Sequence, residues 1–308
     1  MARLLRVVDV PDAVRRRALA HGAGSWLAAL PAIVAELELE WGIRVGPPLE
    51  GGTESFVAHA KLADGEPAVV KLLPPHEQEN WRRQAAVLAL AAGQGCATLL
   101  RCDATRCALL MERLGPSVAE LSLPLEQRHV ILCTAAARLW RPAPDAELPT
   151  GAQKAQWLAG FITATWEELD RPCSTQAVEH ALACAERRGD AHDDERAVLV
   201  HGDLTQWNCL RSADEFKLID PDGLLAEPEY DLGVVMREDP IELLSRADPR
   251  ERARTLARRA DLDAQAVWEW GVVERVSTGL LATQIDLQPI GRQMLQTADH
   301  LAQASPRP

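Results

Sequence analysis

The sequence predicts an α+β protein with a small β-rich N-terminal lobe and a large, mainly helical C-terminal lobe. Between residues 45 and 112, short apolar runs alternate with turn residues, a pattern typical of a small sheet. Most of the following chain instead repeats its apolar residues at helical spacing. The dipeptide Gly115-Pro116 is the clearest break in composition between the two patterns. We therefore predict two lobes, at residues 1–114 and 115–308.

The small lobe is predicted to open with a helix and to continue with strands. The run SWLAALPAIVAELELEWG carries apolar residues at roughly helical spacing, and its Gly42 is a stop signal. The turn KLADGEP precedes the apolar strand AVVKLL, which contains Lys71. We predict a further helix over EQENWRRQAAVLALAAG, then two strands joined by a turn over CATLLRCDATRCALLMERL.

The large lobe is predicted to be helical, with one β unit in the middle. Three helices are expected before this unit, over LEQRHVILCTAAARLW, KAQWLAGFITATWEELD and TQAVEHALACAERR. Their tryptophans Trp140, Trp157 and Trp166 are predicted core residues, because large aromatic side chains are mostly buried. Two amphipathic helices are expected near the C-terminus, over VWEWGVVERVSTGLLATQ and PIGRQMLQTADHLAQA.

The β unit, VLVHGDLTQWNCLRSADEFKLIDPDG at residues 198–223, carries the strongest functional signal. It predicts a strand, a polar turn with His201, Asp203 and Asn208, a second strand, a turn, and a third strand ending at Asp220. These polar groups would meet at one end of the unit. A turn-forming role would explain any one of them, but not all four in register with two apolar strands.

The spacing within this unit matches a known catalytic pattern. H-x-D-x-x-x-x-N is the catalytic loop of protein kinases, and Asp220-Pro221-Asp222 stands where those enzymes carry D-F-G. In phosphoryl transfer from ATP, the protein mainly positions the reactants and neutralises charge. Asp203 is suited to take the proton of an attacking hydroxyl, and Asn208 and Asp220 offer the hard oxygen ligands that Mg2+ prefers. We therefore predict ATP and Mg2+ as cofactors.

A second part of the predicted nucleotide site lies in the small lobe. Lys71 ends AVVK as the ATP lysine ends V-A-I-K on the third kinase strand, where it would bind the α- and β-phosphates. An exposed edge-strand lysine is the alternative interpretation. Gly51 and Gly52 would let the backbone approach the phosphates, and Thr53 and Ser55 could donate hydrogen bonds. Alone, this glycine pair would indicate only an ordinary hairpin.

The combined segments HGDLTQWN, LIDPDG and EPEYDLG resemble the aminoglycoside phosphotransferase family. Further stretches between Trp26 and Leu301 are similar to the branch that contains streptomycin 6-kinases and hydroxyurea kinases. The resemblance implies a protein-kinase-like two-lobed fold with ATP between the lobes. It also implies Asp203 as catalytic base, and Asn208 and Asp220 as Mg2+ ligands.

Two residues depart from the pattern of this branch. Matching QAAVLAL to its helix places Gln84 where a glutamate should hold Lys71. Gln84 could accept a hydrogen bond without adding charge, Glu77 or Glu79 could substitute, or this register could be wrong. Asp222 replaces the lysine of I-D-P-K-G, which makes the site more acidic and makes Asp222 a candidate substrate contact.

The resemblance also assigns supporting roles. Asp231, in EPEYDLG, is implied to brace the catalytic loop, to which His201 also belongs. Residues 111–114, including Glu112 and Leu114, would form the hinge whose backbone binds adenine, although a buried strand end explains them equally well.

Composition limits the class of substrate. A formal net charge of -12 argues against a nucleic-acid surface and suits a cationic small molecule. Glu269 and Glu274 could contact such a substrate, or could be surface helix positions. No apolar run approaches the ~18 residues that span a bilayer, and the N-terminal residues lack the apolar core of a secretory signal. Seven cysteines without a C-x-x-C pair fit free thiols in a reducing compartment, so we expect a cytoplasmic protein.

The leading hypothesis is ATP- and Mg2+-dependent phosphorylation of a small-molecule hydroxyl, most simply on an aminoglycoside of the streptomycin type. A kinase for hydroxyurea or another small metabolite is the alternative within enzymes. A nucleotide-binding pseudokinase is suggested by Gln84 and the short glycine pair. A helical interaction protein would leave the spacing from His201 to Asp220 unexplained. The sequence leaves the oligomeric state open.

Overall fold

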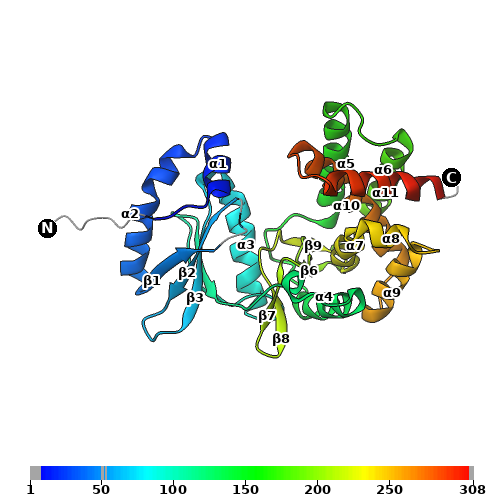
Figure 1. The fold of residues 1–308 in the computed structure, drawn as a ribbon. Coiled ribbons are helices and arrows are strands. Elements are labelled where there is room, and N and C mark those ends of the chain that lie inside the picture. Colours follow the sequence, from blue (N-terminus) through cyan, green and yellow to red (C-terminus); the bar gives the residue numbers. More distant parts are fainter. Residues whose placement is uncertain (1–7, 50–51, 53, 305–308) are drawn as a thin grey trace. The chain divides into compact units, whose positions relative to one another are not determined.

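The computed structural model describes residues 8–49, 52 and 54–304. The chain divides into two units, residues 1–115 and 116–308 (Figure 1). The first unit is built on an antiparallel sheet with strand order β1-β2-β3-β5-β4. Its strands are β1 (Arg44–Pro48), β2 (Phe56–Lys61), β3 (Pro67–Leu72), β4 (Leu99–Asp103) and β5 (Ala108–Glu112).

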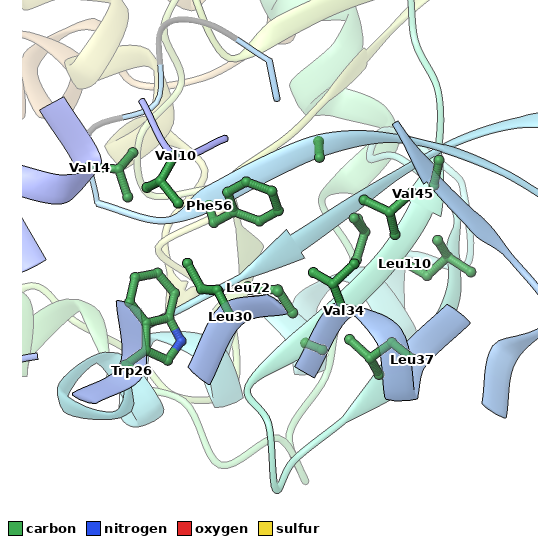
Figure 2. Close-up of a cluster of buried hydrophobic side chains, with 14 of the residues drawn as sticks. Val10, Val14, Trp26, Leu30, Val34, Leu37, Val45, Phe56, Leu72 and Leu110 are labelled. Carbon is green, nitrogen blue, oxygen red and sulfur yellow. The ribbon is translucent and has the colours of Figure 1, made fainter. Parts of the chain in front are cut away.

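One face of this sheet packs against the helix predicted from SWLAALPAIVAELELEWG. The helix, α2 (Gly24–Trp41), follows α1 (Asp12–Ala20) and ends as predicted, with Gly42 in the left-handed conformation at φ 64°. Every third or fourth residue of α2, from Trp26 to Leu37, is buried against the sheet, where it meets Phe56 and Leu110 (Figure 2). The apolar spacing read from the sequence is therefore the core-facing stripe of α2.

The opposite side of β3 positions Lys71. Side chains alternate between the two faces of a strand, and Val70 and Leu72 belong to the core formed with α2. Lys71 therefore points away from that core, and its ammonium group reaches α3 (Gln78–Ala91). The Trp81 indole of α3 donates a hydrogen bond to the Ala108 carbonyl of β5 at 3.2 Å, which ties this helix to the sheet.

The second unit is mainly helical. It contains two small antiparallel pairs, β6 with β9 and β7 with β8; β6, β7 and β8 are the three strands predicted for the β unit, and β9 was not predicted. The strands are β6 (Val198–Val200), β7 (Cys209–Ser212), β8 (Glu215–Leu218) and β9 (Leu224–Ala226). The helices are α4 (Leu125–Leu139), α5 (Gly151–Glu168), α6 (Thr175–Asp190), α7 (Glu229–Arg237), α8 (Pro240–Leu244), α9 (Arg250–Ala260), α10 (Ala264–Gln284) and α11 (Ile290–Ala304).

Helix α10 runs through the centre of this unit and packs on α5, α6, α7, α9 and α11. Its crossing with α7 is very close. A Cβ atom added to Gly233 would lie 2.3 Å from Trp270 Cβ, and one added to Gly271 would lie 2.4 Å from Met236 Cγ. Only glycine at both positions permits this approach, which brings the side chains of α7 and α10 within hydrogen-bonding distance of one another.

The predicted tryptophan core is correct only in part. Trp166 is buried and donates its indole hydrogen to the Cys173 carbonyl at 2.9 Å. Trp140 is half-buried, whereas Trp157 is 58% exposed and stacks on Phe161 with ring centroids 5.4 Å apart. The prediction for Trp157 is wrong because α5 buries the stripe containing Leu158 and places Trp157 on its other side. Among the described residues, no helix is long and apolar enough to cross a membrane.

Candidate active site

The predicted catalytic loop joins β6 to β7, and Asp231 of α7 holds its backbone through hydrogen bonds. The buried carboxylate of Asp231 accepts hydrogen bonds from the backbone N–H groups of His201 and Gly202 at 3.0 and 2.9 Å. It also accepts one from the Trp140 indole at 2.9 Å. Burial raises the pKa of Asp231, and these three donors oppose that rise. The carboxylate thus replaces the strand partner that the loop backbone lacks.

His201 links the loop to the strand that carries the second acidic residue. The Asp203 backbone N–H donates to His201 Nδ1 at 3.2 Å, so the ring proton is on Nε2. Nε2 in turn donates to the Ile219 carbonyl at 2.9 Å. Between these residues, Gly202 has φ 88°, and a Cβ there would lie 2.7 Å from Asp222 Cβ. Glycine at position 202 is therefore required by both conformation and space.

The Asp203 carboxylate is held through both of its oxygens. Asn208 Nδ2 donates to Oδ2 at 2.8 Å and to the Asp203 carbonyl at 3.1 Å. Arg237 Nη2 donates to Oδ1 at 2.6 Å. Burial acts to raise the pKa of Asp203, but the opposing effects, led by the charge of Arg237, outweigh it and the net pKa is lowered. The side chain retains 36% exposure, so the carboxylate remains accessible.

Asn208 and Asp220 lie at the same end of the β7–β8 hairpin. The pairing of Cys209 with Leu218 is continued by a hydrogen bond from the Ile219 N–H to the Asn208 carbonyl at 2.9 Å. Asp220 follows immediately, with φ 56°, a conformation that aspartate tolerates better than most residues. Because Asn208 Nδ2 is bonded to Asp203, its Oδ1 is the atom suited to ligate a cation.

Asn208 and Asp220 offer an amide oxygen and a carboxylate, the kind of hard oxygen ligand that Mg2+ takes. Among residues 8–49, 52 and 54–304, no three His, Cys, Asp or Glu side chains form a metal-binding group. A single carboxylate and an amide oxygen are nevertheless a sufficient protein contribution for Mg2+, which takes its remaining ligands from water and phosphate. Asn208 and Asp220 therefore fit a Mg2+ ion that binds together with a nucleotide.

In the first unit, Lys71 meets the residue that the alignment of QAAVLAL indicated. Its buried ammonium group donates to Gln84 Oε1 at 3.0 Å. The two glutamates considered as substitutes lie elsewhere. Glu77 accepts from Asn80 at 3.3 Å, and the exposed Glu79 is 3.9 Å from Arg83. Lys71 is buried, so the alternative of an exposed edge-strand lysine is wrong.

The remaining residues of the predicted nucleotide site are only partly described. Gly51 and Thr53 lie outside the described residues. Ser55 is buried just before β2, and Leu114 is half-buried beyond the end of β5. Glu112 Oε1 accepts from Thr98 N and Oγ1 at 2.6 and 2.7 Å. Gly52 precedes Ser55, and a Cβ there would lie 3.5 Å from the Ser55 carbonyl. Their roles in adenine and phosphate binding stay predictions.

The three acidic residues proposed as substrate contacts have different environments. Asp222 is close to the catalytic loop, and its side chain is 46% exposed, with Lys154 Nζ at 3.5 Å. Glu269 is 2% exposed and forms ion pairs with Arg187 and Arg188 at 2.6 Å. Glu274 is also buried, and its oxygens bind Arg237 and Tyr230. The interpretation of Glu269 and Glu274 as surface positions is therefore wrong, and neither carboxylate is open to a bound molecule.

Two further residues of the site, Arg237 and Lys154, were not predicted from the sequence. Arg237 binds Asp203 from a position 34 residues later in the chain. Lys154, on α5, lies 3.5 Å from Asp222 and 5.1 Å from the centroid of the Trp157 ring. No local spacing connects these residues to the H-G-D motif. The rarity of lysine in a chain with 33 basic residues was the only signal that could have singled out Lys154.

The chain is similar to known kinases of small molecules. A family model described as aminoglycoside/hydroxyurea antibiotic resistance kinase matches residues 42–283. A streptomycin 6-kinase of Streptomyces glaucescens is 29% identical over 272 residues, covering 83% of this chain and 83% of that protein. A hydroxyurea phosphotransferase of Kitasatospora aureofaciens is 28% identical over 237 residues, covering 75% of this chain and 69% of that protein.

The fold is shared with solved structures. A thermostable mutant of an aminoglycoside phosphotransferase, solved in a ternary complex with ADP and hygromycin B, has a TM-score of 0.62 and 13% sequence identity. The match covers 90% of this chain and 100% of that protein. The predicted α+β, protein-kinase-like fold, with a β-rich N-terminal lobe and a mainly helical C-terminal lobe, is therefore confirmed.

Proposed function

The chain belongs to the aminoglycoside/hydroxyurea antibiotic resistance kinase family, and on that basis we propose that it transfers a phosphoryl group from ATP to the hydroxyl of a small molecule. The acceptor that we propose is an aminoglycoside of the streptomycin type. The observation that carries this proposal is the joint placement of Asp203, Asn208 and Asp220 at one end of the β unit. ATP is a cytoplasmic metabolite, so we place the activity in the cytoplasm.

Each proposed role follows from the position of a side chain. Asp203 would accept a hydrogen bond from the attacking hydroxyl and take its proton late in the reaction. Asn208 and Asp220 would hold Mg2+, which when bound neutralises charge on the phosphates. His201 and Asp231 keep the loop backbone in place through the hydrogen bonds described above.

We assign the phosphate-binding role in the first unit to Lys71. A buried ammonium group held by Gln84 has few rotamers open to it, so its direction is set before a nucleotide binds. Gly52 and Ser55 are proposed to contact the phosphates as well, and residues 112–114 to contact the adenine through their backbone.

The acceptor side of the proposal uses Asp222 and the exposed aromatic side chain of α5. Asp222 abuts the catalytic loop at Gly202 and exposes its carboxylate. Lys154 lies between Asp222 and the ring of Trp157. A partly exposed carboxylate and an exposed indole on either side of Lys154 suit an acceptor that combines cationic groups with ring faces, as an aminoglycoside does. The net charge of -12 would also attract such a molecule.

Hydroxyurea is a second candidate acceptor, because the hydroxyurea phosphotransferase and the streptomycin kinase have nearly equal identity to this chain, 28% and 29%. The small size of hydroxyurea offers no use for Trp157, so a role for that side chain would separate the two candidates.

Phosphate transfer from ATP should be measured with streptomycin, other aminoglycosides, hydroxyurea and cellular metabolites, with Mg2+ and with a chelator. Asp203→Ala is the matched control, and its folding should be checked by circular dichroism and thermal unfolding. A product formed only by the wild type and only with Mg2+ supports the proposal and identifies the acceptor. ATP binding with no transfer to any acceptor would instead favour a pseudokinase. Substantial activity of folded Asp203→Ala would refute the role of Asp203.

A further inference from the structure

Arg237 lies at the last turn of α7 with its guanidinium group between two carboxylates. Nη2 donates to Asp203 Oδ1 at 2.6 Å, and Nη1 donates to Glu274 Oε2 at 2.7 Å. The side chain is 13% exposed. A planar guanidinium can bind two acceptors in a fixed relative direction, which a lysine ammonium group cannot do.

The second carboxylate keeps the guanidinium in place. Glu274 lies on the central helix α10, and its other oxygen accepts a hydrogen bond from the hydroxyl of Tyr230. Tyr230 is fully buried and packs edge-on against Trp270, with ring centroids 4.7 Å apart. Both oxygens of Glu274 are therefore bound, and neither the carboxylate nor the tyrosine has room to turn.

This arrangement depends on the close crossing of α7 and α10. Gly233 and Gly271 allow the two helix backbones to approach, as described above, and Tyr230 and Arg237 of α7 then reach Glu274 of α10. The same short helix carries Asp231, which holds the backbone of the catalytic loop. Helix α7 therefore fixes both the backbone and the Asp203 side chain of that loop.

The consequence for Asp203 is a defined carboxylate plane. With Asn208 on Oδ2 and Arg237 on Oδ1, rotation about the Cβ–Cγ bond would break at least one charge-assisted hydrogen bond. With Asn208 alone, the other oxygen would lose its fixed direction. An arginine next to a general base lowers its basicity, but the hydroxyl proton leaves late in phosphoryl transfer, so orientation matters more than basicity.

We propose that Arg237 is a positioning residue that orients the Asp203 carboxylate toward the acceptor hydroxyl, with Glu274 as its buried counter-charge. The inference rests on the proposed function. It predicts that loss of Arg237 slows the chemical step while binding of ATP is retained.

The test compares Arg237→Met with a matched control, Arg188→Met. Arg188 is also 13% exposed and also lies between two carboxylates, Glu227 at 3.3 Å and Glu269 at 2.6 Å, but it has no contact with Asp203. Both variants should lose thermal stability. Arg237→Met should in addition lose roughly 100-fold in kcat, the scale of a misplaced catalytic group, with the KM for ATP changed less than about twofold. Arg188→Met should keep kcat within about twofold.

Two conservative variants separate orientation from charge. In Arg237→Lys the charge remains, but one ammonium group cannot serve both carboxylates in the same geometry, so kcat should stay at least about tenfold low. In Glu274→Gln the acceptor for Arg237 remains without its charge, so kcat should fall less than in Arg237→Met. Wild-type kcat in Arg237→Met, or an equal loss of kcat in Arg188→Met, would overturn the inference.

A measurement that needs no turnover keeps the inference distinct from the proposed function. In 15N-arginine NMR spectra, Arg237→Met identifies the Arg237 guanidinium signals, and Asp203→Asn should shift them. Unshifted signals would overturn the inference whatever the activity. If these signals shift but the wild type transfers no phosphate to any acceptor, the proposed function fails while the contact between Arg237 and Asp203 stands.

Discussion

The ammonium group of Lys71 donates a hydrogen bond to the amide oxygen of Gln84 at 3.0 Å, at the position where the resemblance implies a glutamate. The orientation of the amide is set by a second bond, from Gln84 Nε2 to Asn80 Oδ1 at 3.0 Å. Gln84 thus supplies the acceptor that Lys71 needs without supplying a negative charge. The hydrogen bond from Lys71 to this position is kept, and only its electrostatic strength differs from that of a lysine–glutamate pair.

Replacing Gln84 tests whether geometry or charge is needed there. Gln84→Glu should keep kcat/KM for ATP within roughly threefold of wild type or raise it, because a charge-assisted bond is stronger than a neutral one. Gln84→Leu should lower it at least about tenfold, since a buried ammonium group then loses this acceptor. Steady-state kinetics at varied ATP concentration measures both. An unchanged kcat/KM in a folded Gln84→Leu protein would show that this hydrogen bond has no role in nucleotide use.

Asp231→Asn should reduce both stability and activity. The carboxylate accepts three N–H donors, whereas an asparagine presents one oxygen and directs its own N–H2 group at a donor. The free energy of unfolding should fall by about 3 kcal/mol, as expected when buried donors lose their partners. Urea unfolding measures this loss, and kcat should also fall because the catalytic loop is no longer held.

The control for this prediction is Asp299→Asn. Asp299 accepts from the backbone N–H and hydroxyl of Ser174 at 2.8 and 2.6 Å, and Ser174 caps α6 rather than the catalytic loop. This variant should lose stability and keep kcat. A loss of kcat equal to that of Asp231→Asn would indicate a general effect of instability.

His129 should make the stability of the protein depend on pH. Burial, together with the charges of Arg252 and Arg128 and against that of Glu242, lowers its pKa to about 3. In the unfolded chain the pKa is about 6.5, so below that pH the unfolded state binds a proton that the folded state does not. His129 therefore leaves the free energy of unfolding unchanged above pH 6.5 and lowers it progressively as the pH falls from 6.5 toward 3.

Between pH 7 and pH 5 this loss is about 2 kcal/mol for a histidine with these two pKa values. Urea unfolding of wild type and His129→Gln at pH 7, 6 and 5 gives the free energy of unfolding of each protein as a function of pH, and the slopes of the two curves are then compared. The variant should show the flatter dependence on pH, and parallel curves would contradict the prediction.

Trp157→Ala should weaken binding of the acceptor alone. An exposed indole in contact with a cationic ring contributes on the order of 0.5–2 kcal/mol, so the acceptor KM should rise about 2- to 30-fold. The kcat and the KM for ATP should stay near wild type. Leu39→Ala, which removes an exposed apolar side chain of the first unit, is the control and should change neither KM. An unchanged acceptor KM in Trp157→Ala would remove this side chain from the acceptor site.

Much of the site could be predicted because it is local in the chain. His201, Asp203, Asn208 and Asp220 lie within 20 residues of one another, and the turns of a short hairpin bring them together. The partnership of Lys71 with Gln84 was indicated by the resemblance, and the hydrogen bond confirms it between β3 and α3, the next α-helix in the chain. The bracing role of Asp231 came from resemblance alone, since its distance from the loop gives no local pattern.

The sequence by itself determined most of the strands and helices and the hydrogen-bonding residues of the catalytic loop, because these depend on spacing over a few turns of chain. Only the tertiary structure decided which side of α5 carries Trp157, that Glu269 and Glu274 are buried in ion pairs, and that Arg237 meets Asp203. These outcomes depend on the crossing of α7 and α10 at Gly233 and Gly271 and on the packing around it. A charged side chain is stable in such an interior only where packing supplies a partner, and no local spacing specifies that partner.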